Sequence, residues 1–329
     1  MRYLSELADN ERIAELHDKS FIFGTDVCCT ALTEGDGEKR VNLLALGDVG
    51  GTVLMGLRIM GSGVISHIGI YDLNEKLLRR YEREINQIWF PDGRSMPQVR
   101  ILQESELFDC DMFILCASKG VPPVGAGGDV RMAQLEANRQ LISVYSKLAV
   151  DAGFKGIFAV VSDPVDPLCK AALCCGLAPW QVQGYGLGVM NGRAMYYAEK
   201  DVKFNRYIRE GRAFGPHGED LVIADSVFDY DHEKSLELTA LAVNSNMETR
   251  ADGFKPYIAP AISSGSISII ETLSSGWNYS SVYFGNNGQG AFLGCRNRRT
   301  ECGIEIENLP LDDMLFSRIE RAYRNLEKL

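Results

Sequence analysis

The sequence predicts an α/β protein in which a doubly wound parallel sheet is followed by a second domain of mixed α+β structure. Two observations support this prediction. Between residues 41 and 162, short apolar runs of strand length alternate with segments of helix length, which is typical of a parallel sheet with helices on both faces. From about residue 167 the pattern turns to longer helices and an antiparallel ribbon. A chain of 329 residues suits two domains of moderate size.

The expected elements follow one another in a simple order. The N-terminal extension, residues 1–40, contains a short helix, the strand-like "FIFGTDVCCTAL" and a polar turn. The first domain, residues 41–166, has expected strands at 41–47, 67–73, 98–102, 111–118 and 156–162 and expected helices at 51–63, 75–88 and 131–153. The second domain, residues 167–329, includes the ribbon "SVYFGNN…GAFLGCRN" and a final helix at 311–329.

Composition excludes several classes of function. The formal net charge of −10 argues against a nucleic-acid or anionic-membrane surface. The nine cysteines form no CxxC pair, and there are only four histidines, so we expect no metal site and reduced thiols in a cytoplasmic protein. The charged N-terminus predicts no secretory signal, and no run of 18 apolar residues predicts a membrane span.

The glycine-rich turn "ALGDVGGT" lies between the first expected strand and its helix. Ala45, Gly47 and Gly50 fit a small-x-Gly-x-x-Gly pattern, with Asp48 and Val49 inside it. Such a turn lets backbone N–H groups approach a pyrophosphate at the helix N-terminus. Asp72 ends the next strand, where an acid bonds the adenosine ribose and repels a 2′-phosphate, which favours NAD over NADP. The alternative is a tight turn with a capping acid.

Several segments match one known family in order and spacing: "ALGDVGGT", "IYDLNEK", "RMAQLEAN", "VVSDPVDPL", "VQGYGLGVMNGR" and "GPHGED". Over residues 41–325 the sequence resembles the lactate/malate dehydrogenases. The resemblance implies a Rossmann-type first domain that binds NAD, a C-terminal catalytic domain, and hydride transfer between nicotinamide and a 2-hydroxy acid. It also implies a homodimer or homotetramer that packs through helices of the first domain, an interface to which the N-terminal extension could add.

The resemblance assigns roles to single residues. His217 in "GPHGED" is the expected general acid–base. Arg131, seven residues before Asn138, matches the arginine of a mobile loop that polarises the substrate carbonyl. Arg193 matches the arginine that binds the substrate carboxylate. Asn138 and Ser162 are expected at the nicotinamide end. The alternatives are a structural histidine, an exposed Arg131 and a structural ion pair at Arg193.

Two departures from the family pattern alter the expected site. Where the family has an aspartate that pairs with the catalytic histidine, this sequence has Met190, followed by Asn191. Where the family has the asparagine of "NPVD", this sequence has Asp163. We therefore expect Asp163 to be the partner of His217; the alternative is that Asp163 meets a cationic group on the substrate.

Substrate preference follows from the loop before Arg131. The position that holds a second carboxylate in malate-type enzymes falls on Pro123, Val124 or Gly125, and a further pocket position on the apolar Ile258. We therefore expect a small 2-keto or 2-hydroxy monocarboxylic acid. Two other functions remain open. One is a dinucleotide-binding protein that has lost turnover, and the other is a dehydrogenase for an amino or imino substrate.

Overall fold

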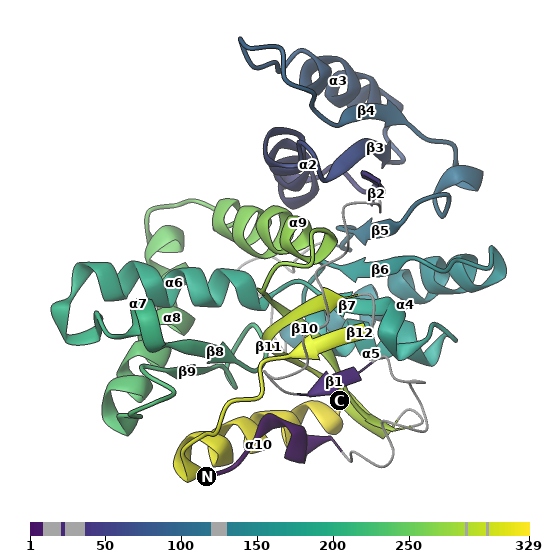
Figure 1. The fold of residues 1–329 in the computed structure, drawn as a ribbon. Helices are drawn as coiled ribbons and strands as arrows, with labels where there is room; N and C mark the ends of the chain where they lie inside the picture. Colours follow the sequence, from purple (N-terminus) through teal and green to yellow (C-terminus); the bar gives the residue numbers. More distant parts are fainter. Residues whose placement is uncertain (9–20, 24–36, 120–129, 287–288, 301–302) are drawn as a thin grey trace.

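The structure is a computed structural model that describes residues 1–8, 21–23, 37–119, 130–286, 289–300 and 303–329 (Figure 1). Ten strands form one sheet in the order β1-β12-β11-β10-β7-β6-β5-β2-β3-β4, and β8 and β9 form a separate ribbon. The predicted fold class is confirmed: a parallel Rossmann-type half is joined to a C-terminal α+β half.

The parallel half has the strand order of a doubly wound nucleotide-binding sheet. Its members are β2 (Lys39–Leu44), β3 (Ile65–Tyr71), β4 (Gln98–Ile101), β5 (Met112–Leu115), β6 (Ile157–Val160) and β7 (Val182–Gly184). The order reverses between β2 and β5, so the carboxyl ends of these strands border a crevice where ligands bind in such sheets.

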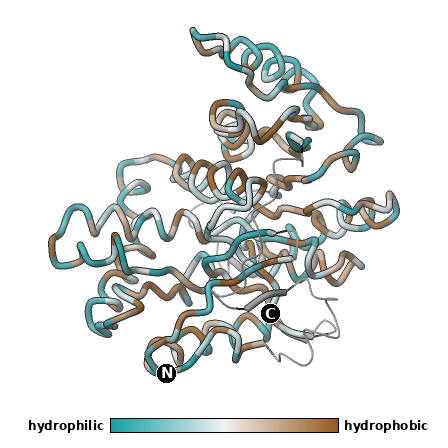
Figure 2. The backbone as a smooth tube through the Cα atoms, viewed as in Figure 1, coloured by the Kyte–Doolittle hydropathy of each residue, from teal (hydrophilic) through white to brown (hydrophobic). Residues whose placement is uncertain are grey.

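Helices cover both faces of this half. On one face, α2 (Asp48–Met60), α3 (Glu75–Asn86) and α9 (Ser268–Leu273) share a core with Leu43 of β2. On the other, α4 (Val130–Asp151) and α5 (Val165–Cys174) share a core with Leu44. Consecutive side chains of a strand point to opposite faces, so the apolar run in β2 serves both cores. Figure 2 shows α3, which buries little of its surface, as largely hydrophilic.

The C-terminal half extends the sheet with antiparallel strands. The predicted ribbon is confirmed as β10 (Asn278–Asn286) and β11 (Gln289–Thr300), and β10 pairs with β7 through Ser281 and Gly184. The remaining elements are β1 (Phe21–Phe23), β12 (Gly303–Ile306), β8 (Arg212–Phe214), β9 (Val222–Ala224), α6 (Leu187–Lys200), α7 (Tyr207–Glu210), α8 (His232–Ala251), α10 (Asp313–Glu327), the π-helix η5 (Pro260–Ile267), and the 3₁₀ turns η1 (Leu4–Leu7), η2 (Glu104–Glu106), η3 (Pro179–Gln181) and η4 (Val202–Phe204).

The predicted boundary at residue 166 falls in α5, the helix between two paired strands of one continuous sheet. Strand β7 follows α5 and pairs in parallel with β6, so the parallel half includes a strand that the sequence analysis assigned to the second domain. The division into two domains stays a prediction. Among the described residues, no helix combines the length and the apolar character needed to cross a membrane.

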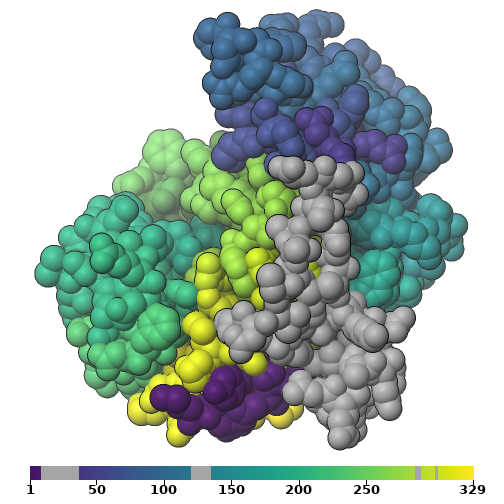
Figure 3. All heavy atoms as spheres, viewed as in Figure 1, coloured from purple at the N-terminus to yellow at the C-terminus, as the bar shows by residue number. Residues whose placement is uncertain are grey.

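The first eight residues pack against the chain's own C-terminal helix. Leu4 and Leu7 are buried in the core that contains Phe316 of α10. The backbone of Arg2 pairs with Leu311, and the Arg2 guanidinium lies 4.0 Å from the centre of the Phe316 ring. In Figure 3, this purple segment lies against the yellow C-terminal residues. This part of the extension therefore completes a core within the chain.

The turn between β2 and α2 is tight. Ala45 has a φ of +73°, in the left-handed region that favours glycine. Gly50 faces it: a Cβ on Gly50 would lie 1.9 Å from the Ala45 carbonyl oxygen. The turn and the first turn of α2 are thus in direct contact, and only a hydrogen atom fits between them at position 50.

Replacing Leu4 by alanine tests whether the N-terminal segment is part of the C-terminal core. Because the Leu4 side chain is 1% exposed, Leu4→Ala should lower the free energy of unfolding by about 3 kcal/mol. Urea denaturation measures this value. The matched control is Leu73→Ala, since Leu73 is 87% exposed. Equal effects of the two substitutions would contradict the packing.

Replacing Gly50 by alanine tests the contact in the turn. The added methyl group must displace the Ala45 carbonyl, so Gly50→Ala should lower the free energy of unfolding by about 2 kcal/mol. Gly37→Ala is the control, because a Cβ there meets nothing within 4 Å. Thermal unfolding of both variants is the measurement; a Gly50→Ala variant as stable as the control would show that the turn is looser than described.

Candidate active site

Three of the predicted site residues border one cavity of roughly 190 Å³. Asp163 follows β6, Arg193 lies on α6, and His217 lies in the loop between β8 and β9. The complete lining is Asp163, Pro164, Met190, Arg193, His217, Gly218, Val243 and Asn246. Residues that are up to 83 positions apart in the sequence, from Asp163 to Asn246, therefore form one concave site beside the carboxyl end of the parallel sheet.

His217 contacts Asp163, the partner that the sequence analysis expected. The His217 Nδ1 and Asp163 Oδ1 atoms are 3.1 Å apart. The histidine side chain is 15% exposed and the aspartate 52%. In a neutral imidazole that donates its Nδ1 proton to the carboxylate, Nε2 is left as the nitrogen that accepts a proton. In this tautomer, Nε2 is the ring nitrogen that can exchange a proton with a reacting group.

The start of α6 is shaped to leave room for the histidine. A Cβ on Gly186 would lie 3.2 Å from the His217 Cβ, so a glycine allows the loop to come close at this point. One turn further on, Met190 is 1% exposed and supplies no charge to His217. The Asn191 side chain is used elsewhere, since its Oδ1 accepts a hydrogen bond from the Tyr207 hydroxyl at 2.8 Å.

Arg193 is buried, with 8% of its surface exposed, and is held by uncharged groups. Its Nη2 donates to Asn246 Oδ1, and its Nη1 lies 3.4 Å from the Ala242 carbonyl oxygen and 3.3 Å from the Met190 sulfur. Burial lowers the pKa of Arg193, and the charge of Asp163 opposes this shift. No ion pair joins Arg193 to a carboxylate within the described part of the chain. A guanidinium held in this way can still bind a carboxylate ligand.

Asn138 and Ser162 fasten the loops that carry Asp163. The Asn138 amide donates to the Asp163 carbonyl oxygen at 2.7 Å and accepts from the Lys119 backbone at 2.9 Å. The Ser162 hydroxyl donates to the Ala117 carbonyl oxygen at 2.7 Å. Both side chains are buried, and they join the segments that follow β5 and β6. Their expected role at the nicotinamide end stays a prediction.

The remaining substrate positions are less completely described. The Arg131 side chain, and Pro123, Val124 and Gly125, lie outside the described residues. Ile258 is 65% exposed and borders a larger cavity of roughly 600 Å³ that also includes Arg193 and Asn246. Arg193 and Asn246 line both this cavity and the cavity at His217. The predicted pocket residue Ile258 therefore lies in a cavity next to the histidine site.

The turn before α2 is open at Gly47. A Cβ on Gly47, which precedes the helix, would meet nothing within 4 Å. Asp72 lies beside the turn: its Oδ2 accepts from the Leu46 N–H at 2.8 Å and its Oδ1 from the Asn74 N–H at 2.9 Å. Asp48, the first residue of α2, forms an ion pair with Lys255 at 3.1 Å. The residues fit a dinucleotide at this helix N-terminus, since small residues and free space meet there.

Sequence reasoning missed two residues of the site. Asn246 on α8 accepts a hydrogen bond from the Arg193 guanidinium, and Lys255 after α8 forms an ion pair with Asp48 at the start of α2. Neither lies in a motif, and only the tertiary fold brings α8 and its following loop to α6 and α2.

Comparisons with known proteins agree with these observations. No protein-family model matches the chain. The sequence is 28% identical over 160 residues to an L-lactate dehydrogenase of Corynebacterium glutamicum, which covers 48% of each chain. It is 25% identical over 191 residues to an L-lactate dehydrogenase of Staphylococcus haemolyticus, which covers 58% of each. The matched part thus spans about half the length of these curated relatives.

Solved structures show the same fold over most of the chain. A lactate dehydrogenase from a Medee basin deep-sea metagenome library superposes with a TM-score of 0.71 at 19% identity, covering 89% of this chain and 98% of that one. A malate dehydrogenase from Archaeoglobus fulgidus, solved in complex with NADH, has a TM-score of 0.69 at 17% identity, covering 88% and 97%. In sequence, the chain is similar to L-lactate dehydrogenases over about half of their length, and in fold it is similar to lactate and malate dehydrogenases over most of its own length.

Proposed function

We propose that the protein is an NAD-dependent dehydrogenase that acts on a small 2-hydroxy or 2-keto monocarboxylic acid. The observation that carries this proposal is the meeting of His217, Asp163 and Arg193 around one cavity. An acid–base group with a carboxylate partner, next to a cation that can hold a substrate carboxylate, is the arrangement that this reaction needs. A protein that only bound the dinucleotide would have no physical need for it.

His217 moves the proton in the proposed reaction. A bound nicotinamide cofactor would supply the acceptor for the hydride lost from C2 of the hydroxy acid and, in its reduced form, the donor of the hydride gained by C2 of the keto acid. In reduction, the Nε2 of protonated His217 donates its proton to the C2 oxygen as the alcohol forms. Asp163, at 3.1 Å from Nδ1, stabilises the charged imidazole before this transfer and fixes the ring orientation.

Arg193 holds the substrate carboxylate. Its contacts with Asn246 and Ala242 fix the plane of the guanidinium, so binding costs little side-chain entropy. Arg131 is proposed to stabilise the negative charge that develops on the C2 oxygen. In the cavity lining, the remaining side chains include the apolar Met190 and Val243, which supports a small apolar group on C3 in place of a second carboxylate.

The cofactor is proposed to bind at the turn that contains Ala45, Gly47, Asp48, Val49 and Gly50. The open space at Gly47 supports a pyrophosphate at this place. The Asp72 carboxylate beside the turn supports NAD over NADP, because it would repel a 2′-phosphate.

Two further features of the resemblance are carried over as proposals. A homodimer or homotetramer is supported by the exposed Met55 and Ile59 on α2, which lie four residues apart and so share one helix face. A reducing, cytoplasmic environment is supported by the vicinal pair Cys174 and Cys175, both of which are free thiols.

The test is NADH oxidation by the purified protein with a panel of 2-keto acids. The panel runs from pyruvate through branched and aromatic side chains to oxaloacetate. We expect turnover of a small monocarboxylate, with oxaloacetate a poorer substrate, and a loss of at least about a hundredfold in kcat/KM in His217→Ala, because general acid–base catalysis contributes on this scale. His67→Ala is the control, because His67 lies in β3, which two strands, β5 and β2, separate from β6, the strand that precedes Asp163.

The other outcomes separate the alternatives. NADH binding without turnover of any keto acid would contradict the proposal and indicate a dinucleotide-binding protein. Turnover only when ammonium or an amine is added would indicate an amino or imino substrate. Equal rates with NADH and NADPH would contradict the role of Asp72.

A further inference from the structure

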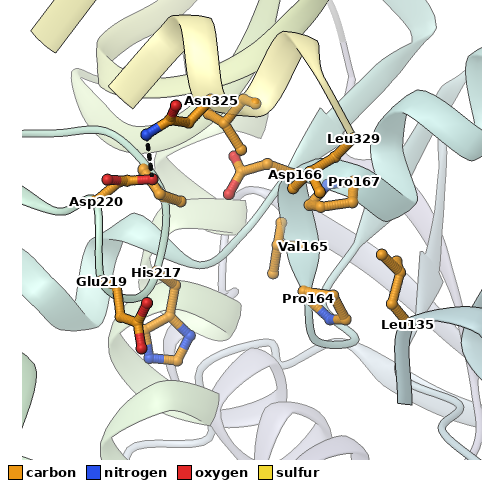
Figure 4. A pocket seen from close by; sticks show the side chains of 12 residues that line it. Leu135, Pro164, Val165, Asp166, Pro167, His217, Glu219, Asp220, Asn325 and Leu329 are labelled. Atoms are coloured by element: carbon orange, nitrogen blue, oxygen red, sulfur yellow. Dashed lines mark hydrogen bonds between the residues drawn. The ribbon is translucent and has the colours of Figure 1, made fainter. Parts of the chain in front are cut away.

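A further cavity, of roughly 350 Å³, also borders His217. It shares His217 and Pro164 with the site described above and opens between α5, the β8–β9 loop and the end of α10. Figure 4 shows its lining, which comprises Leu135, Pro164, Val165, Asp166, Pro167, Pro216, His217, Glu219, Asp220, Asn325, Leu326 and Leu329. Apart from His217, none of the described residues proposed to bind the substrate or the cofactor lines this cavity.

Asp166 is the unusual residue of this cavity. It lies in the first turn of α5 and is 4% exposed, and its Oδ1 has no hydrogen-bond partner within the described structure. A buried carboxylate oxygen without a partner costs free energy unless a ligand or a proton meets it. In Figure 4, its carboxylate points toward the side where Asp220 and Asn325 lie.

The charge of the lining favours a cation. Asp166, Glu219 and Asp220 all contribute carboxyl groups, and the described lining includes no lysine or arginine. Asp220 is held by a hydrogen bond from the Asn325 amide at 3.2 Å. Burial raises the pKa of the Asp166 carboxyl group to about 7, although a hydrogen bond from Ser281 opposes this shift.

The walls favour an organic cation over a metal ion. Seven of the twelve lining residues are apolar: Leu135, Pro164, Val165, Pro167, Pro216, Leu326 and Leu329. No group of three His, Cys, Asp or Glu side chains close enough to hold a metal ion occurs in the described parts of the chain. The carboxylates are therefore spread along an apolar wall, which suits a ligand with one charged end and a short hydrocarbon part.

We propose that this cavity is a second ligand site, which binds a small primary ammonium compound with its charged group on Asp166 and its hydrocarbon part against Val165, Leu135 and Leu326. The inference does not require the dehydrogenase activity. His217 lines this cavity and the 190 Å³ cavity. A cation bound beside Asp166 would therefore disfavour a positive charge on the imidazole, and in this way the ligand would affect the proposed acid–base residue.

The experiment measures binding of n-butylammonium chloride to the intact protein by isothermal titration calorimetry. 1-Butanol is the neutral probe of similar shape, and potassium chloride at equal ionic strength is the charge control. We expect saturable 1:1 binding of the amine and at least tenfold weaker binding of the alcohol. Asp166→Asn, which keeps the shape of the side chain, should weaken amine binding at least tenfold. Glu219→Gln is the control carboxylate and should change it less than threefold.

The pH dependence gives a readout that does not depend on a variant. The cation binds the ionised form of Asp166, so the affinity should rise with pH and then level off. With a pKa of about 7, the ionised fraction, and therefore the affinity, increases about tenfold between pH 6 and pH 8. The charged or titratable groups that act on Asp166 are His217, Asp163 and Cys169. Because imidazoles titrate in the same range, His217→Gln is measured beside the wild type and should keep most of the increase.

Several results would overturn the inference. These are no binding of the amine at millimolar concentrations, equal binding of amine and alcohol, an equal response to potassium chloride, or an affinity that does not change between pH 6 and pH 8. Undiminished binding in a folded Asp166→Asn variant would place the amine elsewhere. None of these results bears on keto-acid turnover, so a failure here is distinguishable from a failure of the proposed dehydrogenase.

Discussion

The hydrogen bond between His217 and Asp163 is the interaction on which the rest of the site depends. It joins the β8–β9 loop to the segment that follows β6, and other residues position both partners. Asn138 holds the backbone of Asp163, and Gly186 gives the histidine room beside α6. In the lactate/malate pattern the carboxylate partner would come from the position of Met190. Here it comes from the sheet, so the same pairing is built from a different element.

This placement contributes to the charge of the cavity that His217, Asp163 and Arg193 line. Asp163 is the carboxylate of the cavity lining, and it faces two groups that can be positive, the imidazole of His217 and the guanidinium of Arg193. Among the described lining residues, one negative charge and two positive ones leave a net charge of about +1 when His217 is protonated, and this sign suits an anionic substrate. Met190, at the position where the family has its aspartate, adds only an apolar surface and a contact with Arg193.

Much of this architecture could be predicted because it depends on local patterns. Alternating strands and helices predicted the parallel half, and the ribbon in residues 281–297 was predicted from its apolar runs. The expected pairing of Asp163 with His217 followed from two compensating substitutions in motifs. Other features depend on tertiary contacts without a sequence signal. Asn246 reaches Arg193 only because α8 packs on α6, and β7 joined the parallel sheet although it follows the expected boundary. The unpartnered oxygen of Asp166 depends on a cavity closed by α10, which no motif near residue 166 indicates.

The pairing is tested most directly by removing the carboxylate at position 163 and introducing one at position 190. The kcat for the preferred keto acid is measured in Asp163→Asn, in Met190→Asp and in the double variant. If a carboxylate beside His217 is what matters, Asp163→Asn should lose at least about a hundredfold in kcat, and adding Met190→Asp should restore at least tenfold of it. The Met190→Asp variant alone is the control for the effect of a buried acid at that position. Full activity in a folded Asp163→Asn variant would contradict the central claim.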